Sequence, residues 1–423
     1  FSCWGHDRPT TPSIDAFARD AVLYRSARAP SPWTVPSHGS LFTGLPPGAH
    51  GLHWSALPAA GDSLPPRLGK LARSADERLL ARRLKARGYS TIGVSNNPWV
   101  SSKTKLDQGF DHFVLRPSPQ SGDRGRAERS LEAIVKHFEE QTPAEPFFLF
   151  LNLIEPHFPY DPPPGFHGRF GGKFADVPAG HWTLELSMIA GALRVDPEVL
   201  APLYDEELCY VDDVVGRLLD WLRERDDYRA SLIVVTSDHG ELLGEGGRYS
   251  HQLSVADELI LIPLLVKYPE NEGAGRIEEN PLVSLTDVWR TILRAAGDDG
   301  PNGERWSQDL RTMDRFARNW TITEYFFAVR YLQQLARIHP GFDPTAHEVV
   351  RRVVFADGVA HVFEGDELRQ VADERTPPGA SLPADVLEEV EAYVRSRAPV
   401  VGSEEALGDE ATVQALRSLG YVE

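Results

Sequence analysis

Apolar runs alternate with amphipathic segments along most of the chain. Runs rich in β-branched and aromatic residues predict strands at 89–95, 147–153, 231–236 and 259–266. Apolar residues spaced three or four positions apart predict helices at 11–22, 76–88, 127–141, 203–224 and 283–296. Strands and helices that alternate in this way are typical of α/β folds. We therefore expect a doubly wound, mostly parallel sheet with helices on both faces, and Pro263 indicates an edge strand or a bend in the last run.

The pattern changes after residues 297–304, which are rich in Gly, Asp and Pro. Residues 353–363 contain two strand-like runs around Asp357-Gly358, which is a hairpin signal. A helix is predicted at 385–397, after a Pro-rich stretch. These features predict a main α/β domain and a small C-terminal α+β subdomain packed on it, with bounds of 1–315 and 316–423.

Composition narrows the class of partner. The 423 residues include 44 basic and 62 acidic side chains, for a formal charge of −18, which argues against nucleic acid because binding phosphates needs a basic face. It leaves room for an anionic substrate, since a metal ion supplies positive charge locally. No apolar stretch is long enough to span a bilayer. Cys3 and Cys209 are too few for a disulfide framework or a zinc cluster, and whether they pair stays open.

The residues after the run 231–237 carry the strongest chemical signal. Asp238-His239-Gly240-Glu241 would place a carboxylate and an imidazole at the C-terminal end of a buried strand, where open α/β sheets build their sites. An aspartate oxygen with a histidine nitrogen suits Mn, Fe or Zn, and less obviously Ca. We expect Glu241 and Glu245 to hold the loop after the strand, not the metal.

A second segment places a hydroxyl at the start of a helix. Pro36 lies near the beginning of a predicted helix that Gly44 closes, so Thr34 falls at its N-terminus. Backbone N–H groups and the helix dipole favour an anion there. A hydroxyl bound to a divalent metal can ionise and attack phosphorus or sulfur. The alternative is that Thr34 only caps the helix.

Together the two segments resemble the sulfatase family of the alkaline phosphatase superfamily. Thr34-Val-Pro-Ser-His38, followed by Leu41-Phe-Thr-Gly44, resembles the signature in which Cys or Ser heads C/S-x-P-S-R before a Leu-x-Thr-Gly tail. Thr236-Ser-Asp-His-Gly-Glu241 resembles the family's second metal-binding motif. Further landmarks are similar at Pro9–Asp15, Gly88–Thr91, Gln108–Asp111, Asn152–Tyr160 and Leu416–Glu423.

The resemblance implies a set of site residues. The implied catalytic residues are Thr34 as nucleophile, His157 beside the leaving group and His251 beside the anionic group. The implied ligands of one divalent ion (Mn, Ca or Zn) are Asp238, His239 and Thr34. His38 and Asn97 match positions that contact the substrate.

Three departures from the family pattern modify this picture. Thr34 cannot become formylglycine, and a Thr nucleophile instead resembles the phosphodiesterases, nucleotide pyrophosphatases and phosphoethanolamine transferases of the superfamily. His38 replaces an Arg, which hydrogen-bonds more strongly than a neutral imidazole. The family's Asp pair, which supplies the other metal ligands, has no counterpart in residues 1–8. We therefore expect an N-terminally truncated sequence that lacks the first strand and has too few ligands for a tight site.

The resemblance implies a metal-dependent hydrolase of sulfuric, phosphoric or phosphonic esters with a Thr nucleophile. The expected substrate is an anionic small-molecule or glycan ester. Two alternatives remain: a catalytically impaired sulfatase-like binding protein, and a phospho-group transferase of the same superfamily. The compartment and the oligomeric state stay open.

Overall fold

A computed structural model gives the arrangement of most of the chain. It describes residues 1–54, 68–116, 126–141, 143–172, 181–225, 227–279, 282–301, 305–315 and 318–397. The C-terminal landmark of the sequence comparison, Leu416–Glu423, lies outside the described residues. Within the described part of the chain, no helix is both long enough and apolar enough to cross a membrane.

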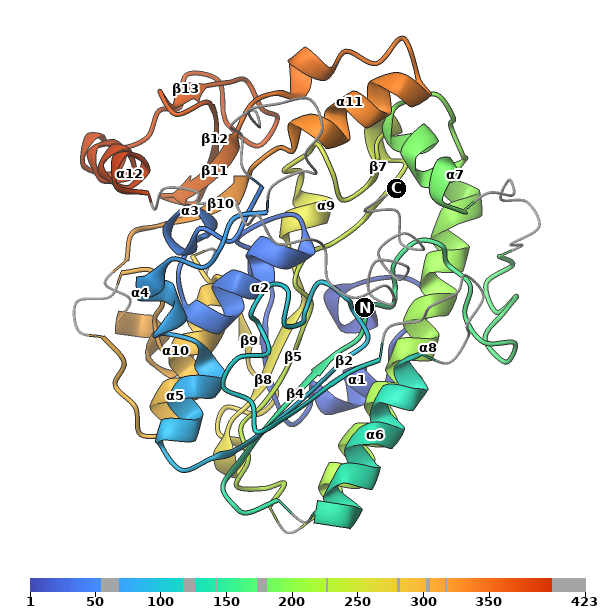
Figure 1. Cartoon of the computed structure of the whole chain (residues 1–423), viewed down its shortest axis with the longest axis vertical. Helices are drawn as coiled ribbons and strands as arrows, with labels where there is room; N and C mark the ends of the chain where they lie inside the picture. The colour runs from blue at the N-terminus through green and yellow to red at the C-terminus, as the bar shows by residue number, and fades with distance from the viewer. Residues whose placement is uncertain are drawn as a thin grey trace.

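Two sheets form the centre of the molecule (Figure 1). The first has the order β3-β2-β4 and is parallel, with strands His112–Leu115, Ser90–Ser95 and Phe147–Asn152. The second has the order β5-β8-β1-β9, with strands Ile233–Thr236, Leu264–Lys267, Val22–Tyr24 and Ile277–Glu278. Strand β8 is antiparallel to both of its neighbours, so this sheet is mixed. The parallel strands β2 and β4 end together at Ser95 and Asn152.

Helices lie on both sides of the strands (Figure 1). On one side are α2 (Thr34–Thr43), α5 (Leu80–Ala86) and α10 (Leu285–Ala295), and on the other are α1 (Pro12–Phe17), α6 (Arg126–Gln141) and α8 (Pro197–Arg223). The short or peripheral helices are α3 (Pro47–His50), α4 (Arg73–Asp76), α7 (His181–Ile189), α9 (Asp257–Ile260) and α11 (Val329–Ile338).

Strand β4 is apolar from Phe147 to Leu151 because both of its faces are covered. Phe148 and Phe150 pack in the core cluster that contains Phe42 of α2. The alternate residues Leu149 and Leu151 pack in the cluster of α6 on the opposite face. Successive strand side chains point to opposite faces, so a strand covered by helices on both sides has to be apolar throughout.

The C-terminal part forms a small antiparallel sheet with one covering helix. Its order is β10-β11-β12-β13, with strands Trp320–Tyr325, Arg351–Ala356, Val359–Glu364 and Arg369–Gln370, and the helix is α12 (Ala384–Ser396). The predicted hairpin is present, because β11 pairs with β12 around Asp357 and Gly358, whose φ angles of 50° and 77° suit a tight turn. Val354 of the sheet packs with Val386 and Val390 of α12.

Two predicted elements differ from the structure. The helix predicted at 11–22 ends at Phe17. Val22 instead begins strand β1, because β1 is buried between β8 and β9 in the sheet. The strand predicted at 259–266 divides into helix α9 and strand β8, which begins after Pro263. Proline has no N–H for a ladder, so it stands before the strand. The edge-strand interpretation of Pro263 was wrong, since β8 lies between β5 and β1.

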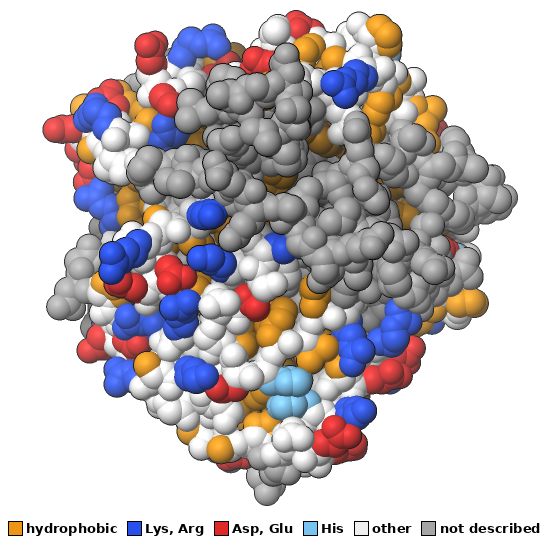
Figure 2. All heavy atoms as spheres, viewed as in Figure 1, with side chains coloured by type: hydrophobic (Ala, Val, Ile, Leu, Met, Phe, Trp, Pro, Cys, Tyr) orange, Lys and Arg blue, Asp and Glu red, His pale blue; other side chains and the backbone are white. Residues whose placement is uncertain are grey.

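The surface in Figure 2 carries both signs of charge. Over the described residues of this face, lysine and arginine side chains are interspersed with aspartate and glutamate. This face therefore presents a mixed surface and not a continuous basic one.

A two-stranded hairpin, β6 (Leu242–Leu243) with β7 (Tyr249–Ser250), completes the described strands and follows the Asp238 motif.

Candidate functional site

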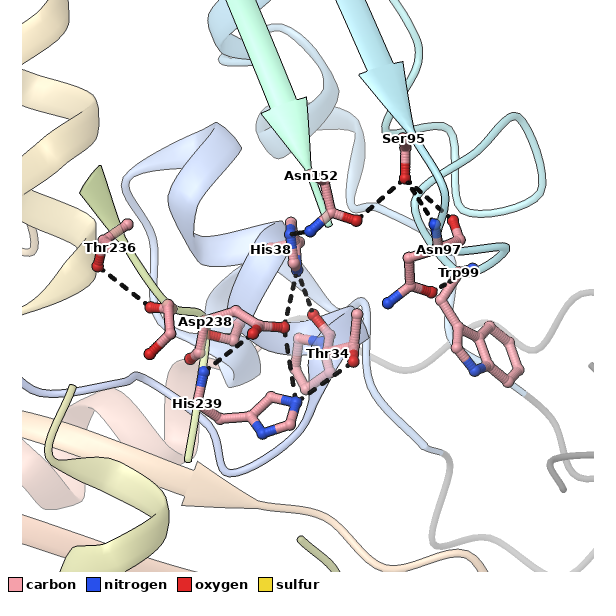
Figure 3. Close-up of polar contacts among 12 residues, drawn as sticks. Thr34, His38, Ser95, Asn97, Trp99, Asn152, Thr236, Asp238 and His239 are labelled. Carbon is pink, nitrogen blue, oxygen red and sulfur yellow. Dashed lines mark hydrogen bonds and ion pairs between the residues drawn. The ribbon is translucent and has the colours of Figure 1, made fainter. Parts of the chain in front are cut away.

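Thr34 is the first residue of α2 and is almost fully buried. The N-cap position is Trp33, and no side chain caps this helix, so Thr34 is not the N-cap of the alternative prediction. Its Oγ1 instead lies 3.3 Å from Nε2 of His239. The helix start and the end of strand β5 therefore meet at this hydroxyl (Figure 3).

His239 has a defined orientation. Its Nδ1 lies 2.8 Å from the carbonyl oxygen of Gly240, and because a carbonyl only accepts, Nδ1 carries the proton. The Nε2 lone pair then faces Thr34 and lies 3.6 Å from Oδ2 of Asp238. Burial lowers the pKa of His239 below its ordinary value, although Asp238 opposes this shift. A neutral imidazole with one nitrogen held by a backbone carbonyl is the form that binds metals.

Asp238 is held by groups from helix α2. The hydroxyl of Ser37 donates to its backbone carbonyl at 2.7 Å, and Nδ1 of His38 lies 3.2 Å from its Oδ2. Burial alone would raise the pKa of Asp238, but the imidazoles of His239 and His38 hold it well below its ordinary value. The carboxylate is therefore charged at neutral pH.

His38 lies in a chain of hydrogen bonds that reaches two strand ends. Ser95 donates to Oδ1 of Asn152 at 3.0 Å, so the amide nitrogen of Asn152 faces Nε2 of His38 at 3.2 Å. Nε2 is then the acceptor and Nδ1 the donor, toward Asp238 and toward the carbonyl of Thr34 at 3.0 Å (Figure 3). In this geometry both ring nitrogens of His38 contact protein atoms, whereas the sequence suggested that His38 contacts the substrate.

His157 and His251 lie beside His239. The ring centroid of His251 is 4.6 Å from that of His239 and 5.2 Å from that of His157. Nδ1 of His157 donates to the carbonyl of Phe158 at 2.7 Å. Burial lowers the pKa of His157 and of His251 to about 4, so both rings are neutral at neutral pH. The three imidazoles thus form one cluster, and His239 is the ring that contacts Thr34.

Glu241 is a buried carboxylate of this cluster that the sequence assigned only to holding a loop. Its Oε1 lies 3.1 Å from Nδ1 of His251. Burial raises the pKa of Glu241 to about 7, although His157 opposes this shift. Glu245 does hold the loop, since it accepts the backbone N–H of Leu243 at 2.6 Å.

Asn97 joins the site through strand β2. Its backbone N–H donates to Ser95 Oγ at 3.1 Å, and its Oδ1 accepts the N–H of Trp99 at 3.0 Å. Figure 3 shows its amide group on the side of the site that holds Thr34. The neighbouring Asn96 is used within the fold, since it donates to Glu155 at 2.8 Å.

Ser95 and Asn152 were missed by the sequence analysis, although a signal was present. They are the last residues of strands β2 and β4, and polar residues at the carboxyl ends of parallel strands are expected to meet at one edge. Which histidine they would meet depended on the position of α2, which the sequence did not provide.

The donor set fits part of a divalent metal site. Thr34 Oγ1, Asp238 Oδ2 and His239 Nε2 converge, with separations from Nε2 of 3.3 and 3.6 Å. Two tetrahedral ligands at about 2.1 Å from one ion lie about 3.4 Å apart, which agrees with these distances. Among the residues that the structure describes, however, no group of three or more His, Cys, Asp or Glu side chains is arranged to hold a metal. The described residues therefore offer three ligands to a metal ion: a hydroxyl, a carboxylate and an imidazole. A complete coordination shell would need further ligands besides these three.

Comparison with known proteins gives matches to sulfatases. The sulfatase family model matches residues 1–298. The ulvan-active sulfatase of Formosa agariphila is 25% identical over 347 residues, covering 73% of this chain and 62% of that protein. Human N-sulphoglucosamine sulphohydrolase is 28% identical over 308 residues, covering 67% of this chain and 55% of that protein. The chain thus spans less than two thirds of the length of these curated relatives.

Solved structures show the same fold at low identity. The phosphonate monoester hydrolase of Agrobacterium radiobacter superposes with a TM-score of 0.63 and 18% identity, covering 86% of this chain and 84% of that one. The protein BT4656, solved with D-glucosamine-2-N,6-O-disulfate, superposes with a TM-score of 0.65 and 16% identity, covering 93% and 95%. At such identities the likeness establishes the architecture only.

Proposed function

Because the chain belongs to the sulfatase family of the alkaline phosphatase superfamily, we propose that it hydrolyses sulfuric, phosphoric or phosphonic esters with Thr34 as its nucleophile. The observation that carries the proposal is the approach of Thr34 Oγ1 to 3.3 Å from Nε2 of His239, beside Asp238. A hydroxyl placed among these groups is in the position that a nucleophile of this chemistry needs.

The residues have distinct roles in this proposal. Thr34 Oγ1 forms a bond to phosphorus or sulfur while the bond to the leaving oxygen breaks. That oxygen departs with its electron pair and takes up the proton that the hydroxyl of Thr34 gives up. Asp238, His239 and Thr34 would hold a divalent ion, which as a Lewis acid lowers the pKa of the hydroxyl. Water then cleaves the ester on Thr34, and the hydroxyl is restored.

His157 and His251 would bind the ester oxygens. The Nδ1 atoms of both rings face protein oxygens, on Phe158 and on Glu241. In this proposal both rings lie on the side of the site that faces the ester, and Asn97 would add an amide to the same anion. These groups act in a buried site, where hydrogen bonds to developing charge are strongest.

Thr34 favours phosphorus over sulfur in this proposal. It is a plain alcohol and cannot become the aldehyde hydrate on which conventional sulfatases depend. The overall substrate class is an anionic small-molecule or glycan ester. A glycan is supported by the ulvan-active relative and by the disulfated glucosamine bound to BT4656.

The test compares the whole chain with three variants on p-nitrophenyl sulfate, bis-p-nitrophenyl phosphate and a p-nitrophenyl phosphonate. Thr34→Ala should lower kcat at least about 1,000-fold, and Thr34→Ser should restore part of the activity. Thr43→Ala is the matched control, since Thr43 lies at the other end of α2 and donates to Gly39. The proposal is wrong if Thr34→Ala stays within a few-fold of the wild type.

Two further experiments test the role of the metal ion and the identity of the acceptor. Dialysis against a chelator should remove the activity, and re-addition of Mn, Zn or Ca should restore it. Glycerol added as a competing acceptor distinguishes transfer from hydrolysis, because a transferase forms the glycerol ester and a hydrolase releases the free anion. Metal-independent turnover would contradict the role given to Asp238 and His239.

A further inference from the structure

We infer that Trp54 is a specificity-determining residue that stacks on a flat ring of the ester substrate, either an aryl or a pyranose ring. The inference rests on the proposed function, because it names the organic group that the same site would take. Its basis is an indole cluster of Trp33, Trp54 and Trp99. Trp33 and Trp99 are 1% and 2% exposed, whereas Trp54 is only partly buried.

The indole cluster adjoins the nucleophile. Trp33 is the N-cap residue of α2 and directly precedes Thr34. Trp99 donates its backbone N–H to Oδ1 of Asn97 at 3.0 Å, and Figure 3 shows its indole beside Asn97. The segments that carry two of the three indoles therefore also carry Thr34 and Asn97. A ring attached to an ester at Thr34 would lie on the side of the cluster.

The two buried indoles support the indole of Trp54. Trp33 and Trp54 are stacked, with ring centroids 5.2 Å apart and planes inclined by 6°. Trp99 meets Trp54 nearly at a right angle, with centroids 6.0 Å apart and planes at 89°. Stacked and edge-to-face arrangements are the favourable ones for aromatic pairs. Among the described residues, Nε1 of Trp33 has no hydrogen-bond partner, so this indole acts here through its ring.

The backbone of Trp54 is also held in place. Its carbonyl accepts from Nδ1 of His53 at 2.8 Å, and the ring of His53 stacks on that of Phe326 with centroids 3.6 Å apart. Trp54 forms an antiparallel bridge with Leu68, and Gly69 donates its N–H to the carbonyl of His53 at 2.8 Å. The indole is therefore fixed before a ligand arrives, which lowers the entropic cost of binding.

The alternative is that Trp54 only completes the core. An indole with that role gains most when it is buried as fully as its neighbours, because exposed apolar surface forfeits hydrophobic stabilisation. Trp54 stays partly exposed although two fully buried indoles support it. Small-molecule sites combine aromatic walls with a few polar groups, which Thr34 and Asn97 supply here. A flat ring matches an indole better than an alkyl group does.

The first experiment measures binding without turnover. Calorimetry of the whole chain with Mn present compares phenylphosphonate with methylphosphonate, and glucose 6-phosphate with glycerol 3-phosphate. The wild type should bind the ring-bearing anion at least about 10-fold more tightly in one pair or in both, and the pair identifies the ring as aryl or pyranose. Trp54→Ala should reduce this preference to within about threefold, and Trp54→Phe, which keeps a flat ring, should retain most of it.

The second experiment measures kcat and KM. For the best p-nitrophenyl ester, Trp54→Ala should raise KM at least about 10-fold with kcat within about threefold, since the lost contact is made equally in the ground state and the transition state. For the corresponding ethyl ester, KM should change by less than about threefold. Trp221→Ala is the matched control, because Trp221 of α8 is also partly buried and meets Phe138 at a ring distance of 5.1 Å. It should change neither the binding preference nor KM.

Three outcomes would overturn the inference: no preference for a ring in the wild type, an unchanged preference in Trp54→Ala, or equal rises of KM for the aryl and ethyl esters. Urea unfolding of each variant confirms that it is folded, and Trp54→Phe decides the matter if Trp54→Ala is not. If the wild type hydrolyses no ester, the proposed function fails, while the binding measurement still decides whether Trp54 takes a ring.

Discussion

Nδ1 of His38 lies 3.2 Å from Oδ2 of Asp238, although His38 belongs to helix α2 and Asp238 follows strand β5. The same nitrogen lies 3.0 Å from the carbonyl of Thr34, so one imidazole N–H is shared between the two segments of the site. His38 stands where the sulfatase signature has an arginine. From position 38 of this chain, a single imidazole N–H therefore donates to the carboxylate of Asp238.

Removing that donor should weaken metal binding. In His38→Ala, Asp238 loses a hydrogen bond that orients its carboxylate, and the affinity for Zn or Mn should fall about 10-fold to 100-fold. Competition with a chromophoric chelator measures this. His112→Ala is the control, because His112 is the first residue of β3 and packs on His137 at a ring distance of 4.0 Å. Equal affinities for all three proteins would show that His38 does not support Asp238.

Asn152 should act through His38. Asn152→Ala removes the N–H that directs Nε2 of His38, so the ring can turn away from Asp238. We expect a loss of about 10-fold in kcat, of the order of one hydrogen bond. In the double variant with His38→Ala, the Asn152 change should cost little more, since coupled residues are not additive. Losses that multiply in the double variant would mean that the two side chains act independently.

Stability should fall as the pH drops from 6.5 toward 4. Burial lowers the pKa of His50 to about 3 and those of three other histidines to about 4, namely His53, His157 and His251. With folded pKa values below the unfolded value, the unfolded chain takes up protons first, so stability present above pH 6.5 is lost on acidification.

Two buried carboxylates act in the opposite direction. Burial raises the pKa of Glu185 to about 8 and that of Glu241 to about 7. Their contribution to the free energy of unfolding is therefore present below pH 4.5 and is lost as the pH rises to 8. Four imidazoles outweigh two carboxylates, and the net change is destabilisation in acid. Urea unfolding at pH 7, 5.5 and 4.5 measures it, and His50→Asn should reduce the slope. A stability that rises on acidification would contradict the burial of these rings.

The C-terminal sheet should stabilise the segments that precede and follow Thr34. Glu324 of β10 is fully buried and accepts from Arg352 at 3.0 Å and from the backbone N–H of Gly48 at 2.8 Å. The backbone of β10 also donates to the carbonyl of Pro30. Arg352→Met leaves the carboxylate without its charged partner and should lower the free energy of unfolding by about 3–5 kcal/mol.

An exposed ion pair provides the comparison for this change. Arg305 lies 3.0 Å from Glu389 at the surface, and Arg305→Met should cost at most about 1 kcal/mol. Urea unfolding measures the free energy of unfolding of both variants, and the two losses are compared. If Arg352→Met costs no more than the surface variant, the buried pair within the C-terminal sheet does not stabilise the fold.

Elements with a strong local pattern could be predicted, and those that depend on neighbours could not. The apolar run of β4 and the Asp357-Gly358 hairpin carry their signal within a few residues. The segment 11–22 has helical spacing, yet Val22 begins β1, which pairs with β8 and β9, two strands that come much later in the chain. Long-range pairing overrode local periodicity there.

The motifs around Thr34 and Asp238 were recognised by their resemblance to the motifs of the family, because a hydroxyl, a carboxylate and an imidazole each need a particular side chain at a particular position. Only the folded arrangement decided their partners: Asn152 on His38, and Glu241 on His251. Hydrogen bonds join atoms within about 3 Å, and the distance between two side chains distant in sequence is set by how helices pack on the sheet. That packing is the sum of many contacts, so no single segment of the chain contains it.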